Sequence, residues 1–112
     1  MPVSTERLHD GIAVVQLSPE ASSNTFSAVN FQPLISTLNQ LMSEPDCKSV
    51  ILTGTGRFFS VGGNIGDFSD AIGKGHIGQM VEDMTNQLHP LLLQIRGSET
   101  IFVCAINGDA AG

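Results

Sequence analysis

The stretch SVILTGTGRFFSVGGNIGDF, residues 49–68, constrains the fold of this chain more than any other. It starts as an apolar, β-branched run, passes through glycine-rich turns and ends in residues typical of a helix start. A junction of this kind leaves backbone N–H groups without partners inside the helix, and such groups stabilise negative charge. The chain closes with INGDAAG, directly after another apolar run, which indicates a second junction of the same kind.

Five segments carry a periodic pattern. Apolar or β-branched runs predict strands at Ile12–Leu17, 49–52 and 101–106. Apolar residues at helical spacing predict helices over 31–42 and 77–95. The alternation of strands and helices favours an α/β fold with parallel strands and crossover helices. Ligands bind such sheets at the carboxyl ends of the strands, where both glycine-rich turns lie.

Two of these segments lead to predictions about burial. The run 101–106 is nearly all apolar, as expected for a strand that is covered on both faces. Cys104 lies within it and is predicted to be a small, buried apolar side chain. Met80, Met84 and Leu88 recur at helical spacing, and we expect them to face the core.

Composition excludes several classes of function. The net charge of −6, with scattered basic residues, argues against a nucleic-acid partner. The apolar runs fall far short of the about 18 residues that a membrane span needs. Cys47 and Cys104 form no CxxC pair and no signal peptide is evident, so we expect a cytoplasmic protein. His9, His76 and His89 show no ligand spacing, and no metal site is expected.

The pair Gly62 and Gly63 allows two interpretations. Consecutive glycines let a backbone approach a ligand closely, and a helix start after them would aim free N–H groups at it. One N–H aimed at a developing oxyanion is worth about 3–4 kcal/mol. The simpler interpretation is a tight turn that needs glycine for steric reasons alone. The residues by themselves favour the simpler interpretation.

The run VILTGTGRFFSVGGNIGDF contains a strand, Thr-Gly, a Gly followed by a basic residue, Phe, and then Ser-x-Gly-Gly. This run resembles the first signature of the crotonase (enoyl-CoA hydratase/isomerase) superfamily. IFVCAINGDAAG resembles the second signature, an apolar strand with Asn-Gly and a later Gly run, and SSNTFSAVNFQPLISTLNQL is similar to the first helix region. The resemblance implies a crotonase-like ββα spiral, truncated. Residues 1–112 would form the N-terminal part of a crotonase-like domain.

The resemblance also implies a site. The superfamily holds the carbonyl oxygen of an acyl-CoA thioester between two backbone N–H groups. The first donor of this oxyanion hole falls on Gly63, and Gly112 is adjacent to the second. The loop that meets the CoA moiety would comprise Val61, Gly62, Asn64 and Ile65. In the superfamily the helix that would carry Met80, Met84 and Leu88 borders the acyl site, so an acyl-chain pocket stays a minor alternative to the core for these three residues.

Two residues depart from the superfamily pattern. Asn64 stands where Asp is usual, so the capping ability is kept and the charge is lost. Asp109 stands where an apolar or aromatic residue is common. A carboxylate there either caps a following helix or disfavours an acyl anion, and both alternatives stay open.

The function implied by the resemblance is an acyl-CoA-transforming enzyme of the enoyl-CoA hydratase/isomerase type, which stabilises a thioester enolate. Its acid/base carboxylates are expected after Gly112. No cofactor is expected besides the CoA thioester substrate, and no nucleic acid or membrane partner. The complete protein is expected to be a homotrimer or hexamer. The alternative is a non-catalytic fragment or pseudoenzyme that acts as a CoA-binding or packing module.

Overall fold

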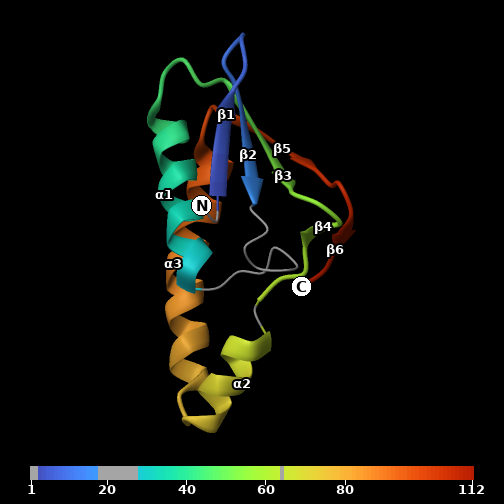
Figure 1. Cartoon of the computed structure of the whole chain (residues 1–112). Coiled ribbons are helices and arrows are strands. Elements are labelled where there is room, and N and C mark those ends of the chain that lie inside the picture. The colour runs from blue at the N-terminus through green and yellow to red at the C-terminus, as the bar shows by residue number, and fades with distance from the viewer. Residues whose placement is uncertain (1–2, 18–27, 64) are drawn as a thin grey trace.

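The computed structural model describes residues 3–17, 28–63 and 65–112 (Figure 1). The described elements follow one another as a strand–strand–helix unit, a strand–strand–helix–helix unit and a final pair of strands. They are β1 (Val3–Arg7), β2 (Ile12–Leu17), α1 (Ala28–Ser43), β3 (Ser49–Gly54), β4 (Phe58–Ser60), α2 (Ile65–Gly73), α3 (Ile77–Gly97), β5 (Ile101–Ala105) and β6 (Asp109–Ala110).

The main sheet has four strands in the order β1-β2-β3-β5. β2, β3 and β5 run parallel, as the sequence predicts, while β1 pairs antiparallel with β2 through a hairpin. Asp10 and Gly11 both have positive φ at that hairpin, at 63° and 75°. β4 and β6 form a second, two-stranded parallel sheet beyond the carboxyl ends of β3 and β5 (Figure 1).

The sequence pattern does not predict β1, β4 and β6, for identifiable reasons. β1 reads VSTER, with one apolar residue, so its strand conformation depends on pairing with β2. β4 and β6 contain three and two residues, too few for an alternating pattern to show. Both predicted helices are confirmed within α1 and α3, and the predicted helix start after Gly63 is α2.

One face of the main sheet carries the core. α1 and α3 lie side by side against this face (Figure 1). The strands alternate, so every second side chain points to the helices. Leu41 of α1 is 1% exposed and is among the largest fully buried side chains, with Val15 and Val50. The cluster consists of Val3, Ala13, Val15, Leu17, Leu34, Leu38, Leu41, Cys47, Val50 and Leu91.

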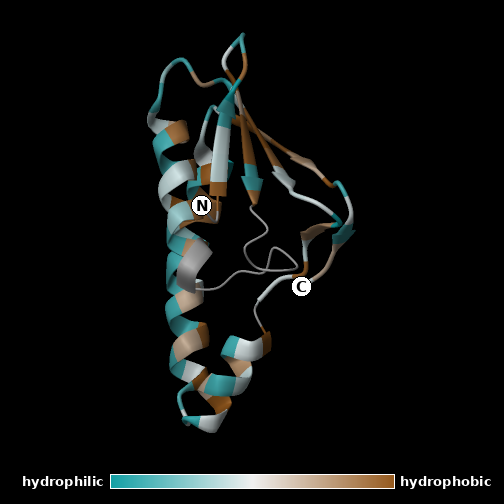
Figure 2. Cartoon of the chain, in the orientation of Figure 1, coloured by the Kyte–Doolittle hydropathy of each residue, from teal (hydrophilic) through white to brown (hydrophobic). Residues whose placement is uncertain are grey.

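The opposite face of the sheet is open near β5, which corrects one prediction. β5 was expected to be covered on both faces, yet Ile101 is 65% exposed and Val103 is also exposed. Figure 2 shows this strand as a largely hydrophobic segment at the border of the sheet. Cys104, predicted to be buried, is exposed because β5 pairs only with β3 among the described strands. An edge position leaves a strand without lateral cover.

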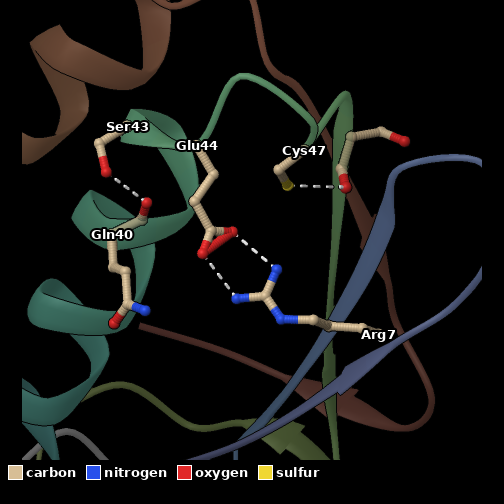
Figure 3. A network of polar contacts seen from close by, with 6 residues as sticks. Arg7, Gln40, Ser43, Glu44 and Cys47 are labelled. Carbon is tan, nitrogen blue, oxygen red and sulfur yellow. Dashed lines mark hydrogen bonds and ion pairs between the residues drawn. The ribbon is translucent and has the colours of Figure 1, made fainter.

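A polar network ties the start of the sheet to the end of α1 (Figure 3). The guanidinium of Arg7 donates to both carboxylate oxygens of Glu44, at 2.6 and 2.8 Å. These hydrogen bonds hold the pKa of Glu44 below its ordinary value of 4.5. Nearby, the Cys47 thiol donates to the backbone oxygen of Ser49 at 3.7 Å, and burial raises the pKa of this thiol. The network anchors β1, which has little apolar surface of its own.

The Glu44 ion pair predicts how stability depends on pH. A carboxyl whose pKa is lowered by folding adds stability above pH 4.5, and this contribution disappears as the pH falls through the lowered value. Glu44→Gln is therefore expected to be less stable than the unmodified protein at pH 7 and equally stable in strong acid. Chemical denaturation across this range measures the difference. A difference that does not shrink in acid would contradict the assignment.

Burial of Leu41 in the core predicts that its truncation lowers stability more than truncation of an exposed leucine does. Leu41→Ala is expected to lower the free energy of unfolding by about 2–5 kcal/mol, because it leaves a cavity where α1 meets the sheet. Leu93→Ala is the matched control, since Leu93 is 72% exposed on α3. It should change stability by no more than about 0.5 kcal/mol. Urea denaturation of both variants makes the comparison, and similar losses would count against this core.

Candidate functional site

The two glycine-rich turns converge beyond the carboxyl ends of β3 and β5. β4 and β6 pair in register Phe58 with Asp109 and Ser60 with Ala110. The pairing continues with the amide of Ala111, which donates to the backbone oxygen of Ser60 at 2.9 Å. Two segments about fifty residues apart in sequence thus run alongside each other into one site.

The tips of the two turns touch through Gly62 and Gly112. A Cβ built on Gly112 would lie 2.7 Å from the Cα of Gly62, and one built on Gly62 would lie 3.0 Å from the Cα of Gly112. Both residues also have positive φ, at 84° and 107°. The Gly62 amide donates to the Ser60 hydroxyl at 3.2 Å. Glycine is required on both sides because the two backbones lie closer than any side chain permits.

Gly63 is constrained by an aromatic ring. A Cβ at this position would lie 2.4 and 2.6 Å from ring atoms of Phe68, which belongs to α2. The ring therefore occupies the space that a side chain at position 63 would need. Gly63 itself forms a single-residue β-bridge shortly before α2.

The two turns open into a cavity of about 620 Å³, within the range of about 300–1,000 Å³ typical of small-molecule sites. Gly62, Gly63 and Gly112 lie in its wall, and side chains from β2 to α3 form the rest. The other lining residues are Leu17, Phe31, Leu52, Phe59, Ser60, Phe68, Val81, Met84, Thr85, Leu88, Ala110 and Ala111.

The cavity is apolar and carries no charged side chain among the described residues that line it. Its polar side chains are those of Ser60 and Thr85, and the Thr85 hydroxyl donates to the backbone oxygen of Glu82 at 3.0 Å. Electrostatic interactions are stronger in apolar surroundings than in water. A backbone amide that faces it is well suited to bind an uncharged acceptor that gains negative charge.

The predicted site residues fall into two groups. Gly62, Gly63 and Gly112 come together in the cavity wall. Val61 is half-buried and Ile65 is 81% exposed, and neither is among the residues that line the cavity. The prediction for Asn64 lies outside the described residues.

Several residues of the site were missed or assigned differently. Met84 and Leu88 were expected to face the core, with a pocket as the minor alternative. Both line the cavity, and Leu88 also packs against the core cluster. Phe59 and Phe68 were not singled out, since isolated aromatic residues next to glycines carry no distinctive pattern. The sequence signal that could have identified the cavity-lining residues of α3 was the large number of apolar residues in this helix, which exceeds the number needed for packing against the sheet alone.

Residues 7–112 match the sequence model of the enoyl-CoA hydratase/isomerase family. The chain belongs to this family. The enoyl-CoA hydratases ACTT3 and AKT3-2 of Alternaria alternata are 28% and 29% identical to it over 103 residues, which make up 92% of this chain and 33% of each relative. The chain thus spans about a third of the length of these curated relatives.

Solved structures show the same fold. The enoyl-CoA hydratases of Bacillus halodurans and Bacillus anthracis match with TM-scores of 0.82 and 0.81, at 22% and 21% sequence identity. Each match covers 96% of this chain, and 43% and 40% of those chains respectively. The fold is therefore that of the crotonase superfamily, as the sequence motifs imply.

Two absences concern other kinds of site. Within 3–17, 28–63 and 65–112, no three His, Cys, Asp or Glu residues gather in a way that would hold a metal ion. No helix in the same ranges is both long and apolar enough to cross a membrane.

The turn after β3 predicts a strong steric effect. A Cβ on Gly54 would lie 2.4–2.7 Å from backbone atoms of Phe58 and Phe59, which cannot move without opening the turn. Gly54→Ala is expected to lower the free energy of unfolding by about 1–3 kcal/mol or more. Gly78→Ala is the control, because it meets nothing within 4 Å at the start of α3. Thermal denaturation should show the control unchanged or more stable, and equal melting temperatures would refute the packing argument.

Proposed function

We propose that this chain provides the thioester-binding half of an acyl-CoA-transforming site of the enoyl-CoA hydratase/isomerase type. The observation that carries the proposal is the meeting of Gly62, Gly63 and Gly112 in the wall of one apolar cavity. The Gly63 amide is the first donor to the thioester carbonyl oxygen. The second donor follows Gly112 in the superfamily pattern.

The chemistry depends on charge that appears during the reaction. Attack of water on a 2-enoyl thioester, with one water proton passed to a base, leaves an enolate whose negative charge rests on the carbonyl oxygen, and so does removal of a proton next to the carbonyl. A backbone N–H stabilises this oxygen more strongly as the charge grows. The apolar lining strengthens the interaction and excludes water. The interaction therefore lowers the barrier rather than merely binding the substrate.

The cavity also suits the acyl chain. Phe68, Met84 and Leu88 are apolar neighbours for a hydrocarbon segment, and Met adapts to different shapes. None of the described lining residues is titratable. We assign proton transfer to the carboxylates that follow the second glycine run in the superfamily.

The remaining parts of the proposal rest on the superfamily pattern. Val61, Gly62, Asn64 and Ile65 contact the CoA moiety, and no cofactor besides the CoA thioester takes part. The complete protein acts as a cytoplasmic homotrimer or hexamer.

The decisive experiment removes one N–H and adds nothing. A side chain at position 63 would displace the Phe68 ring, so conventional variants change the cavity as well as the amide. Chemical synthesis with glycolic acid in place of Gly63 replaces the N–H by an ester oxygen. Calorimetry then compares a short 2-enoyl-CoA thioester with its thioether analogue, which lacks the carbonyl.

The unmodified protein is expected to prefer the thioester several-fold, because a neutral hydrogen bond contributes about 0.5–1.5 kcal/mol. The ester at position 63 should abolish this preference. The same replacement at Gly78, in the first turn of α3 where amides lack helical partners, should leave it unchanged. A preference that survives the ester at 63 would overturn the assigned role. Thioester preference without hydratase or isomerase turnover would favour the alternative of a CoA-binding module.

A further inference from the structure

Asn107 occupies the point where the two signature segments separate from the main sheet. It follows β5, and its side chain spans the turn between β3 and β4. The amide oxygen accepts from the Gly54 amide at 2.9 Å. The amide nitrogen donates to the backbone oxygens of Gly56 at 3.0 Å and Phe58 at 3.2 Å. One side chain thus bonds to both sides of a turn on the neighbouring strand.

Two glycines let the backbones close around this side chain. A Cβ on Gly108 would lie 2.0 Å from the backbone oxygen of Arg57, so the chain after Asn107 passes directly against the turn. Gly54 is equally crowded by the backbone of Phe58 and Phe59. The hydroxyl of Thr53 adds a hydrogen bond to the backbone oxygen of Ala105, at 2.7 Å.

The segments beyond this point have little means of fixing their own alignment. β4 and β6 have three and two residues, and their register shifts between Phe58 and Ser60. Short strands with few ladder bonds specify register weakly. Yet Gly62 must lie opposite Gly112, because a neighbour with a side chain would not fit there. The alignment therefore needs an anchor outside the ladder.

We infer that Asn107 is a positioning residue that sets the register of the two turns and thereby the opposition of Gly62 and Gly112. Its three backbone contacts fix where β4 and β6 begin relative to each other. From there, the Ala111–Ser60 hydrogen bond carries the alignment to the tips. Asn suits this role because its side chain both accepts and donates, which neither Asp nor Ala does. The consequence for thioester binding rests on the proposed function, whereas the register itself does not.

NMR of the whole chain tests the register directly. The close approach of Gly62 and Gly112 predicts a nuclear Overhauser effect between their Hα atoms. Asn107→Ala should lose this signal and the exchange protection of the Gly54 amide. Asn107→Asp keeps the acceptor for Gly54 but turns carboxylate oxygen toward two carbonyl oxygens. It should lose the Gly62–Gly112 signal while Gly54 stays protected.

Asn86→Ala is the matched control, because Asn86 is exposed on α3 and lies outside the cavity lining. It should keep both signals. Protection of the Val15 and Val50 amides shows whether each variant is folded. If Asn107→Ala does not fold, Asn107→Asp decides. Folded Asn107 variants that retain the Gly62–Gly112 signal at full intensity would overturn the inference.

A second measurement separates this inference from the proposed function. Both Asn107 variants should lose the thioester preference while their affinity for the thioether analogue stays the same. If the unmodified protein shows no thioester preference, the proposed function fails, and the NMR signals still decide the role of Asn107. If the preference is present and survives both variants, the positioning role is refuted.

Discussion

The close contact between the backbones of Gly62 and Gly112 is the constraint on which the site depends. It is possible only because neither residue carries a Cβ, and the main-chain hydrogen bond from Ala111 to Ser60 continues the β4–β6 pairing toward it. The contact places Gly62 and Gly112 side by side in the wall of one cavity. The contact also explains why two motifs far apart in sequence behave as one structural unit.

The rest of the fold serves to bring these turns to the same place. α1 and α3 cover one face of the sheet, and buried residues such as Leu41 and Val15 fix the strands under them. Because β3 and β5 are parallel neighbours, their carboxyl ends lie together at one edge of the sheet. The segments that follow the two strands therefore leave the sheet on the same side. α3 then extends past the sheet, so its further side chains, including Met84, form the wall opposite the turns. A single helix thereby contributes to both core and cavity.

The sequence predicts the strongly patterned parts of this arrangement and misses those that depend on tertiary contacts. Apolar runs identify β2, β3 and β5, and helical spacing identifies α1 and α3. The resemblance to the two superfamily signatures indicates the site, whereas the residues alone favour a tight turn, because the contact of Gly62 with Gly112 joins positions far apart in sequence. β1, β4 and β6 are too short or too polar to recognise, since partner strands stabilise them. The prediction that Cys104 is buried was wrong for a related reason: the apolar sequence of a strand does not reveal whether the strand lies at the edge of a sheet.

The position of the Phe68 ring against Gly63 links the size of the cavity to the support of the Gly63 amide, two properties that would otherwise vary separately. A smaller residue at 68 enlarges the cavity but removes the support behind the amide, and a larger residue at 63 is tolerated only if the ring is first lost. Substitutions at these positions are therefore epistatic, and their order matters. Met84 and Leu88 of α3 line the same cavity, so substitutions there change its shape and leave the packing of Phe68 against Gly63 in place.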